Sequence, residues 1–189
     1  EVSIETLSYK GKHQVIAITD KVTTGSPHFV EIEHHQPSNL CVNILKSIEL
    51  ETINALKSIG ITNGASHVEA KINSKGEVYI MEIGSRMGGD FIGSNLVENS
   101  TGVDYLKHTI DIAINNFYVF PEIIKKSYTG VYFISKETKH LKKYFDNNYN
   151  FIKEKKIFNK ELKILKNSND RSGYFIYLSD KKINLHKKD

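Results

Sequence analysis

Two neighbouring segments decide the fold of this chain: His67-Val68-Glu69-Ala70-Lys71 and, after a short turn, Val78-Tyr79-Ile80-Met81-Glu82-Ile83-Gly84-Ser85-Arg86-Met87-Gly88-Gly89-Asp90. Both segments have the pattern of a β-strand, and each places one carboxylate among apolar residues. A buried acid is costly unless a positive group lies beside it. Two such acids on adjacent strands predict a site for a hard cation. The arginine and double glycine that follow predict a phosphate or carboxylate ligand.

The two acids share a site only if the strands pair in the right register. Side chains two apart lie on one face of a strand, so Glu69 shares a face with His67 and Lys71, and Glu82 with Gly84. Carboxylates that lie side by side repel unless a cation bridges them or one is protonated. Because Mg²⁺ combines carboxylate with phosphate oxygens, a magnesium nucleotide is the expected ligand. The alternative is an exposed hairpin whose acids face solvent.

The residues after the second strand add to this hypothesis. Gly88 and Gly89 lack side chains, so the backbone there can approach an anionic ligand closely. Arg86 can clamp a phosphate or a developing oxyanion through two N–H groups. A turn that simply needs glycine is the alternative interpretation.

Length and composition bound the protein class. The 189 residues suffice for one domain of good size, or one domain with a small appendage. No apolar run approaches the ~20 residues that a membrane span needs, so no membrane partner is expected. The chain starts at Glu1 without a recognisable signal peptide, and its single cysteine, Cys41, excludes an internal disulfide. We therefore expect a cytoplasmic protein, and this chain as a piece of a longer one.

Charge divides the chain into unlike halves. Residues 1–120 carry 9 Lys/Arg and 14 Asp/Glu, whereas residues 121–189 carry 17 and 8. This contrast predicts a boundary near Pro121, between domains 1–120 and 121–189. The basic end raises the alternative of nucleic-acid binding. Its lysines are spread singly rather than in a block, which favours an ordinary solvated surface.

The pattern of apolar and turn residues predicts the elements. We expect a helix that starts at Ser38 or Asn39 and ends at Gly60, and a second at 104–115 with Leu106, Ile110 and Ile114 on one stripe. Residues 23–38 are expected to form a long loop or irregular strand. Strands are expected at 2–8, 14–19, 65–72, 77–83, 128–134, 161–165 and 174–178. Hairpins outnumber crossovers, so the predicted class is α+β, an antiparallel sheet with helices on one side.

The segment Glu-Ile-Gly-Ser-Arg-Met-Gly-Gly-Asp-Phe-Ile-Gly-Ser at 82–94, preceded by His-Val-Glu-Ala-Lys at 67–71, resembles the C-terminal half of an ATP-grasp domain. The resemblance is greatest to carboxylate–amine ligases of the L-amino-acid ligase and phosphoribosylglycinamide synthetase type. It extends from Glu1 to about Asn116. Residues 170–174 also resemble the small, β-rich C-terminal subdomain of this branch.

The resemblance implies a role for each matching position. Glu69 and Glu82 match the ligands of the Mg²⁺, or substituting Mn²⁺, that is bound with ATP, and Lys71 lies where it can contact phosphate. Arg86 matches the catalytic arginine that contacts the transferred phosphoryl group. Many relatives have asparagine two residues after the second acid; this chain has Gly84 there.

The substrate side is implied in the same way. Glu31 and His34 match a pair that holds a substrate amino group, with a one-residue ambiguity between His34 and His35. Gly88 and Gly89 are the other expected substrate contacts. For the histidines, the alternative is an ordinary surface loop.

These implications define the expected function: a fragment of an ATP-dependent C–N ligase that joins a small-molecule carboxylate to an amine through an acyl phosphate. The N-terminal half of the same protein is the expected partner, and a homodimer is an open alternative. The rival function is a degenerate module that binds a nucleotide or metabolite without ligation, which Gly84 favours. Nucleic-acid binding lacks an aromatic–basic recognition motif, and hydrolysis lacks a G-x-S-x-G elbow.

Overall fold

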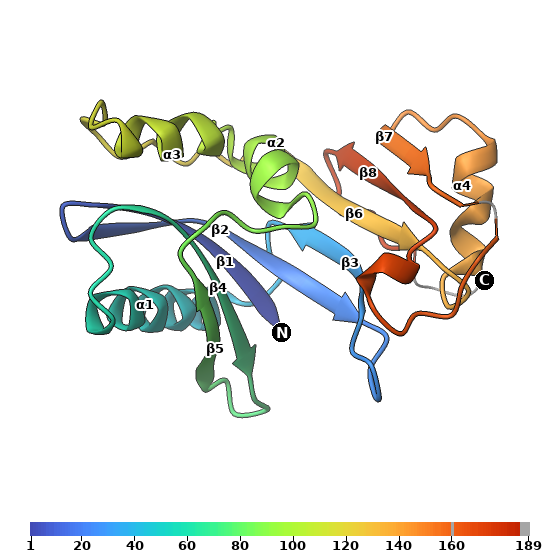
Figure 1. The fold of residues 1–189 in the computed structure, drawn as a ribbon, viewed down its shortest axis with the longest axis horizontal. Helices are drawn as coiled ribbons and strands as arrows, with labels where there is room; N and C mark the ends of the chain where they lie inside the picture. The colour runs from blue at the N-terminus through green and yellow to red at the C-terminus, as the bar shows by residue number, and fades with distance from the viewer. Residues whose placement is uncertain (160, 186–189) are drawn as a thin grey trace. The chain divides into compact units, whose positions relative to one another are not determined.

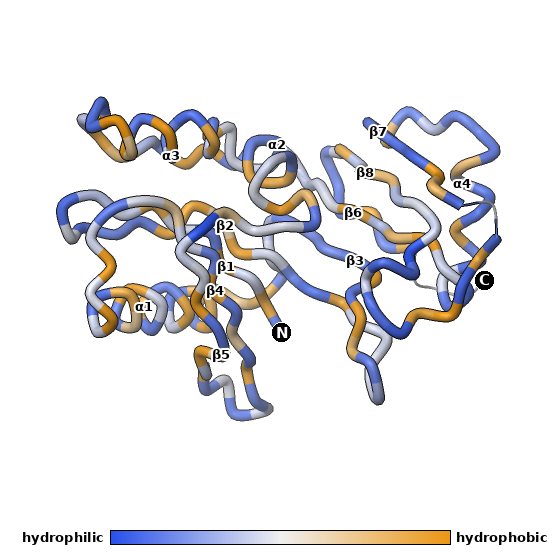
Figure 2. Tube along the Cα trace, viewed as in Figure 1, coloured by the Kyte–Doolittle hydropathy of each residue, from blue (hydrophilic) through white to orange (hydrophobic). Residues whose placement is uncertain are grey.

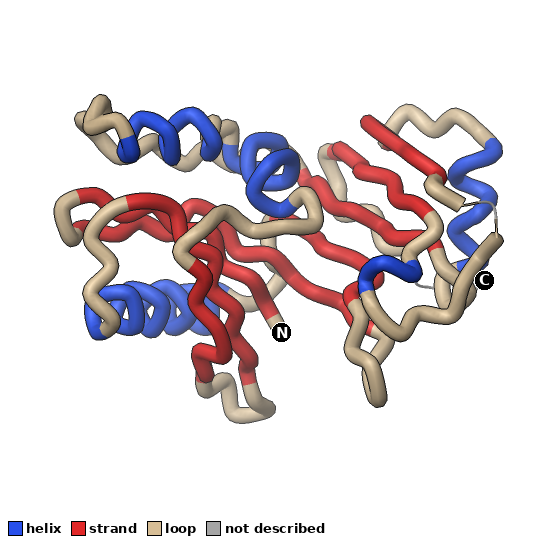
Figure 3. The backbone as a smooth tube through the Cα atoms, in the orientation of Figure 1, coloured by secondary structure: helices blue, strands red, loops and turns tan. Residues whose placement is uncertain are grey.

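The computed structural model describes residues 1–159 and 161–185. They form two compact units, one of Glu1–Asp20 with Gln36–Lys126 and the other of Lys21–His35 with Ser127–Asp189. Figure 1 labels their helices and strands, and Figure 3 colours the chain by secondary structure. The α+β class with antiparallel strands is confirmed. In the described part of the chain, no helix is long and apolar enough to cross a membrane.

The first unit contains the two predicted hairpins. Its strands follow the order β5-β4-β1-β2, and the neighbours pair antiparallel. The strands are β1 (Val2–Tyr9), β2 (Lys12–Thr23), β4 (Gly64–Ile72) and β5 (Val78–Gly84). The central strand β1 is therefore hydrogen-bonded on both sides, whereas β5 lies at an edge.

Helices cover both faces of this part of the sheet, which corrects the expectation of helices on one side (Figure 1). Helix α1 (Val42–Ser58) packs Ile48 and Leu56 against Ile4 and other residues of one face. Helices α2 (Val97–Thr101) and α3 (Tyr105–Ala113) pack against the other face, which includes Leu7. The alternation of β1 places apolar side chains on both faces, so each face needs a cover.

Helix α1 starts later than predicted. Its N-cap is Cys41, which makes no side-chain capping bond. Ser38 and Asn39 lie in the turn before the helix. The Ser38 hydroxyl accepts the N–H of Leu40 at 3.2 Å, and the Asn39 N–H donates to the Asp20 carboxylate at 3.0 Å.

The predicted end of α1 at Gly60 is confirmed. Gly60 has φ +74°, a conformation that glycine adopts without a steric penalty. Its N–H donates to Lys57 O at 3.1 Å, and the N–H of Ile61 donates to Leu56 O at 3.0 Å. This is the Schellman arrangement of a helix end.

Helix α3 starts as predicted, with the Asp104 carboxylate accepting the N–H of Lys107 at 2.9 Å. Its buried residues are Tyr105 and Ile112, on a different side from the predicted apolar stripe. The stripe is at least half exposed: Leu106 56 %, Ile110 50 % and Ile114 65 %. Figure 2 shows hydrophobic colour along α3 accordingly.

The second unit contains the strand order β3-β6-β8-β7. Its elements are β3 (Glu31–Gln36), β6 (Tyr128–Ile134), α4 (Lys143–Asp146), β7 (Ile152–Ile157) and β8 (Gly173–Ser179), with short 3₁₀ turns at Lys139–Lys142 and Ser168–Asp170. Strand β3 lies within the predicted loop 23–38. The predicted strand at 161–165 is wrong, because these residues form no strand, and the two neighbours of β8 are β6 and β7.

We predict that Leu56→Ala lowers the free energy of unfolding by about 2–5 kcal/mol, because Leu56 is fully buried between α1 and the sheet. Leu50→Ala, on the same helix at 58 % exposure, is the matched control and should change it by less than about 1 kcal/mol. Urea denaturation of both variants makes the comparison. Equal losses would contradict the packing described for α1.

Candidate functional site

The two acids of the deciding segments lie directly opposite each other. Glu69 of β4 pairs with Glu82 of β5, and His67 pairs with Gly84. Opposite residues of an antiparallel ladder share a face, with Cβ atoms about 4.5–5.5 Å apart. The register shifts immediately after Glu69, which marks a β-bulge beside the pair. The register thus brings both acid-bearing faces together at the sheet edge, where Glu82 is exposed.

A third acid, Glu5 of β1, lies fully buried next to this pair. It faces His67 across the ladder, and its carboxylate accepts a hydrogen bond from His67 Nδ1 and another from the Gly88 N–H at 2.8 Å. Burial, and then the Glu5 charge, raises the pKa of the neighbouring Tyr105 far above its usual value. Sequence reasoning missed Glu5, although an acid in the middle of a predicted strand was a signal that could have pointed to it.

His67 connects the buried acid to the edge pair. Its Nε2 lies 3.3 Å from Glu69 Oε1, while its Nδ1 faces Glu5. Burial alone would lower the pKa of His67, but the hydrogen bonds and charges of Glu5 and Glu69 raise it to about 9. A positive imidazolium therefore lies between two carboxylates at neutral pH, which offsets part of the cost of burying Glu5.

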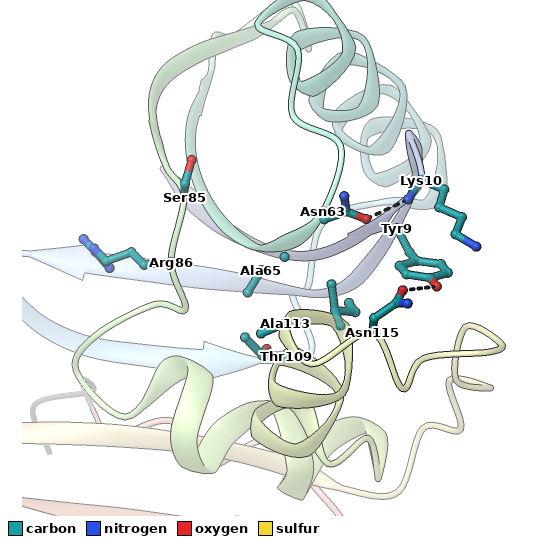
Figure 4. Close-up of a pocket in the computed structure, with 11 residues that line it drawn as sticks. Tyr9, Lys10, Asn63, Ala65, Ser85, Arg86, Thr109, Ala113 and Asn115 are labelled. Atoms are coloured by element: carbon teal, nitrogen blue, oxygen red, sulfur yellow. Dashed lines mark hydrogen bonds between the residues drawn. The ribbon is translucent and has the colours of Figure 1, made fainter.

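Arg86 follows two residues after β5. Its N–H donates to Gly84 O at 2.8 Å, and its Nη1 donates to Met87 O at 2.9 Å. It borders a cavity of about 530 Å³. Figure 4 shows the guanidinium directed away from Tyr9 and Asn115, whose side chains are hydrogen-bonded to each other at 3.1 Å. The exposed charge of Arg86 is therefore available outside that cavity.

Lys71, the expected phosphate contact, is a surface residue in this structure. Its side chain is 56 % exposed, and its Nζ lies 3.7 Å from the Glu1 carboxylate. An exposed ion pair of this kind is worth little energy. The contact of Lys71 with phosphate therefore stays a prediction.

A metal ion at the edge would need ligands beyond the protein. Among residues 1–159 and 161–185, no group of three or more His, Cys, Asp or Glu side chains is arranged to hold one. Glu69 and Glu82 can supply only carboxylate oxygens to a metal ion. Gly84, two residues after Glu82, has no side chain to add another ligand. Two carboxylates completed by ligand oxygens and water suit Mg²⁺ held with a nucleotide, so the donor set fits that ion.

The predicted substrate pair lies in the second unit. The Glu31 carboxylate is 3.2 Å from Arg171 Nη2 and 3.6 Å from Lys21 Nζ. The Arg171 guanidinium stacks 3.8 Å from the centre of the Phe133 ring, and the His34 ring meets the same phenyl edge-on at 5.9 Å. Glu31 therefore already holds two cations, and Phe133 links the surroundings of Glu31 and His34.

The histidines are not surface residues: His34 is 1 % exposed and His35 4 %, so the surface-loop alternative is wrong. His35 Nε2 lies 2.6 Å from Glu33, and its Nδ1 lies 2.9 Å from the Tyr177 hydroxyl. Both ring nitrogens of His35 are thus engaged within the core, and the choice between His34 and His35 as the substrate contact stays a prediction.

Comparison with known proteins gives one sequence match and several similar folds. Residues 1–94 match the model of the ATP-grasp domain. A search of curated proteins gives no match. Among solved structures, the chain resembles the L-amino acid ligase from Bacillus licheniformis, with a TM-score of 0.79 and 23 % identity over 95 % of this chain and 46 % of that one.

Two further structures share the fold. Phosphoribosylglycinamide synthetase from Anaerococcus prevotii has a TM-score of 0.75 and 22 % identity, over 95 % of this chain and 48 % of that one. The biotin carboxylase domain of 2-oxoglutarate carboxylase from Hydrogenobacter thermophilus, solved with MgADP and bicarbonate, has a TM-score of 0.64 and 20 % identity, over 95 % and 41 %. The chain thus spans less than half the length of these structures.

We predict that Gly88→Ala lowers the free energy of unfolding, whereas Gly89→Ala leaves it nearly unchanged. A Cβ at Gly88 would lie 2.8 Å from His67 Nδ1 and closer still to the Glu5 carboxylate, whereas a Cβ at Gly89 meets nothing within 4 Å. The expected loss for Gly88→Ala is about 1–3 kcal/mol of unfolding free energy. Thermal or urea unfolding measures both variants, and equal stability would contradict the close approach of Gly88 to Glu5.

The charged state of His67 predicts a pH dependence of stability. The pKa of His67 is about 9 in the folded protein and about 6.5 when unfolded, so its contribution is complete below pH 6.5 and disappears as the pH rises through 9. The difference in unfolding free energy between the protein and His67→Gln should fall by up to about 3 kcal/mol over this range. Urea denaturation with a chelator present measures it. A difference that stays constant from pH 6 to 10 would contradict the prediction.

Proposed function

Because residues 1–94 of this chain belong to the ATP-grasp family, we propose that the chain is the C-terminal portion of an ATP-dependent carboxylate–amine ligase. The observation that carries this proposal is the opposed pair Glu69 and Glu82 at the sheet edge, with Arg86 exposed just beyond it. The similar folds of an L-amino acid ligase and a phosphoribosylglycinamide synthetase support the same class. An amino-acid-like carboxylate is the proposed substrate, and the cytoplasm the proposed location.

The proposed reaction has two steps and needs no protein nucleophile. A carboxylate oxygen of the substrate attacks the γ-phosphorus of ATP, the bond to the β,γ-bridging oxygen breaks, and ADP leaves. The amine then attacks the acyl carbon of the acyl phosphate; phosphate departs, and the amine loses a proton as the amide forms. Catalysis in such a reaction consists of alignment and charge neutralisation.

Residues of this chain would supply both. Mg²⁺ (or Mn²⁺), held by Glu69 and Glu82, would neutralise charge on the ATP phosphates. Arg86 has an exposed guanidinium that can donate two N–H groups to the transferred phosphoryl group. Gly88 and Gly89 leave the backbone accessible beside it, and Lys71 would contact phosphate by exchanging its exposed pairing with Glu1.

The substrate amino group would be held by Glu31 and His34. Glu31 already forms ion pairs with Arg171 and Lys21, so an incoming ammonium would join an occupied carboxylate. We propose that this arrangement suits an amino acid, whose own carboxylate balances the added cation. The amine substrate and the N-terminal half of the enzyme would complete the reaction; the similar structures are about twice as long as this chain.

One observation favours the rival function, a module that binds a nucleotide without ligation. Gly84 stands opposite His67 and offers no side-chain ligand next to the acid pair. Release of ADP from ATP, measured with the full-length protein and panels of amino acids, separates the two. Ligation requires ADP release that depends on both substrates, whereas a binding module releases none.

We predict that Arg86→Ala in the full-length protein lowers turnover about 10²–10³-fold, the scale observed when one charge-stabilising donor is lost. Lys10→Ala is the matched control, since Lys10 lines the same cavity at its other end (Figure 4). Coupled measurement of ADP release quantifies both variants. Turnover that is unchanged in Arg86→Ala would remove this residue from the mechanism.

A further inference from the structure

We propose that Glu5 is a positioning residue, which holds Glu69 and the segment 84–90 in one fixed arrangement without touching a ligand itself. The proposal rests on the proposed function, in which Glu69 binds the metal ion and Arg86 contacts the transferred phosphoryl group. Glu5 lies fully buried in β1, and its two oxygens face two different elements: His67 in β4 and the Gly88 amide in the segment after β5.

The position of Glu5 suits it to this role. Strand β1 is paired with β2 on one side and β4 on the other, so its backbone is fixed by two ladders. Strand β5, by contrast, is an edge strand with one neighbour. The segment that carries Arg86 leaves from this less constrained edge. The hydrogen bond from the Gly88 N–H to Glu5 attaches that segment to the central strand β1.

The second link runs through His67 to the edge acid. His67 contacts Glu5 with Nδ1 and Glu69 with Nε2, so one imidazole ring fixes the distance between a buried and a partly exposed carboxylate. The Glu69 side chain is 27 % exposed, and its contact with His67 favours one of its rotamers. Holding it in one orientation pre-arranges a metal ligand, which is how neighbours of first ligands raise metal affinity.

The close fit of Gly88 provides independent support. A Cβ at this position would overlap both Glu5 and His67, so the backbone has approached the acid as far as a glycine permits. Such an approach is unnecessary for a turn alone. It is required if the Gly88 N–H must reach a carboxylate in the sheet centre.

Two substitutions separate the two links. Glu5→Met keeps a side chain of similar length but has no oxygen to accept either hydrogen bond, so the bonds from His67 and from the Gly88 N–H are both lost. His67→Gln removes the contact with Glu69 and leaves the bond from Gly88 to Glu5 in place. Leu56→Ala is the control for lost stability, because Leu56 packs on the opposite face of the sheet.

Amide hydrogen exchange of the 189-residue chain, read by NMR, tests the arrangement without any ligand. Relative to the amide of Val68 in β4, exchange at Gly88 should rise at least tenfold in Glu5→Met. It should stay within about threefold of the unsubstituted chain in His67→Gln and in Leu56→Ala. An unchanged ratio in Glu5→Met overturns the proposal.

Mg²⁺ dependence of ADP release by the full-length protein tests the consequence. The Mg²⁺ concentration for half-maximal rate should rise at least fivefold in Glu5→Met and in His67→Gln, but not in Leu56→Ala. An unchanged Mg²⁺ dependence in an active Glu5→Met enzyme overturns the positioning role. If the unsubstituted full-length protein does not consume ATP, the proposed function fails, and the exchange ratio alone decides whether Glu5 positions the segment.

Discussion

The contact between the buried Glu5 carboxylate and His67 is the constraint on which the rest of the first unit depends. A carboxylate without solvent needs partners for both oxygens, and here His67 of β4 and the Gly88 backbone each supply one. The resulting placement sets where the edge acids Glu69 and Glu82 stand. A polar contact in the sheet centre thus specifies the geometry of an exposed edge.

The second unit also buries acidic and polar side chains, and it stabilises them with different residues. Strand β3 carries four consecutive polar side chains, all of them buried: Glu33, His34, His35 and Gln36. His35 joins Glu33 to Tyr177 and lies edge-on to Tyr132, so an aromatic core accepts an acid because a histidine accompanies it. At the start of the strand, Arg171, which lies just before β8, donates hydrogen bonds to the backbone oxygen and the carboxylate of Glu31. In both units, buried acids are tolerated because each one has a specific cationic or hydrogen-bonding neighbour.

Local patterns in the sequence predicted the parts of the fold that local physics controls. The two hairpins and the glycine end of α1 follow from alternation and turn chemistry, and the structure confirms them. Glu69 and Glu82 could be paired because they lie on sequential strands. Glu5 could not be found in this way, since its partners His67 and Gly88 are 62 and 83 residues away in the chain. The polar residues of β3 predict a long loop or irregular strand for a similar reason: they become acceptable in a regular strand only through partners such as Tyr177, 142 residues beyond His35.

The fit between Gly88 and Glu5 also constrains how this protein can change over generations. Each position fills the space that the other leaves, so neither can vary alone without a steric or hydrogen-bonding penalty. A shorter acid at position 5 would vacate about one methylene of room and relieve the clash of a methyl group at position 88 with Glu5, while His67 would still have to shift. Positions 5 and 88 should therefore vary together in laboratory evolution: alanine should be tolerated at position 88 only after a shorter residue has replaced Glu5.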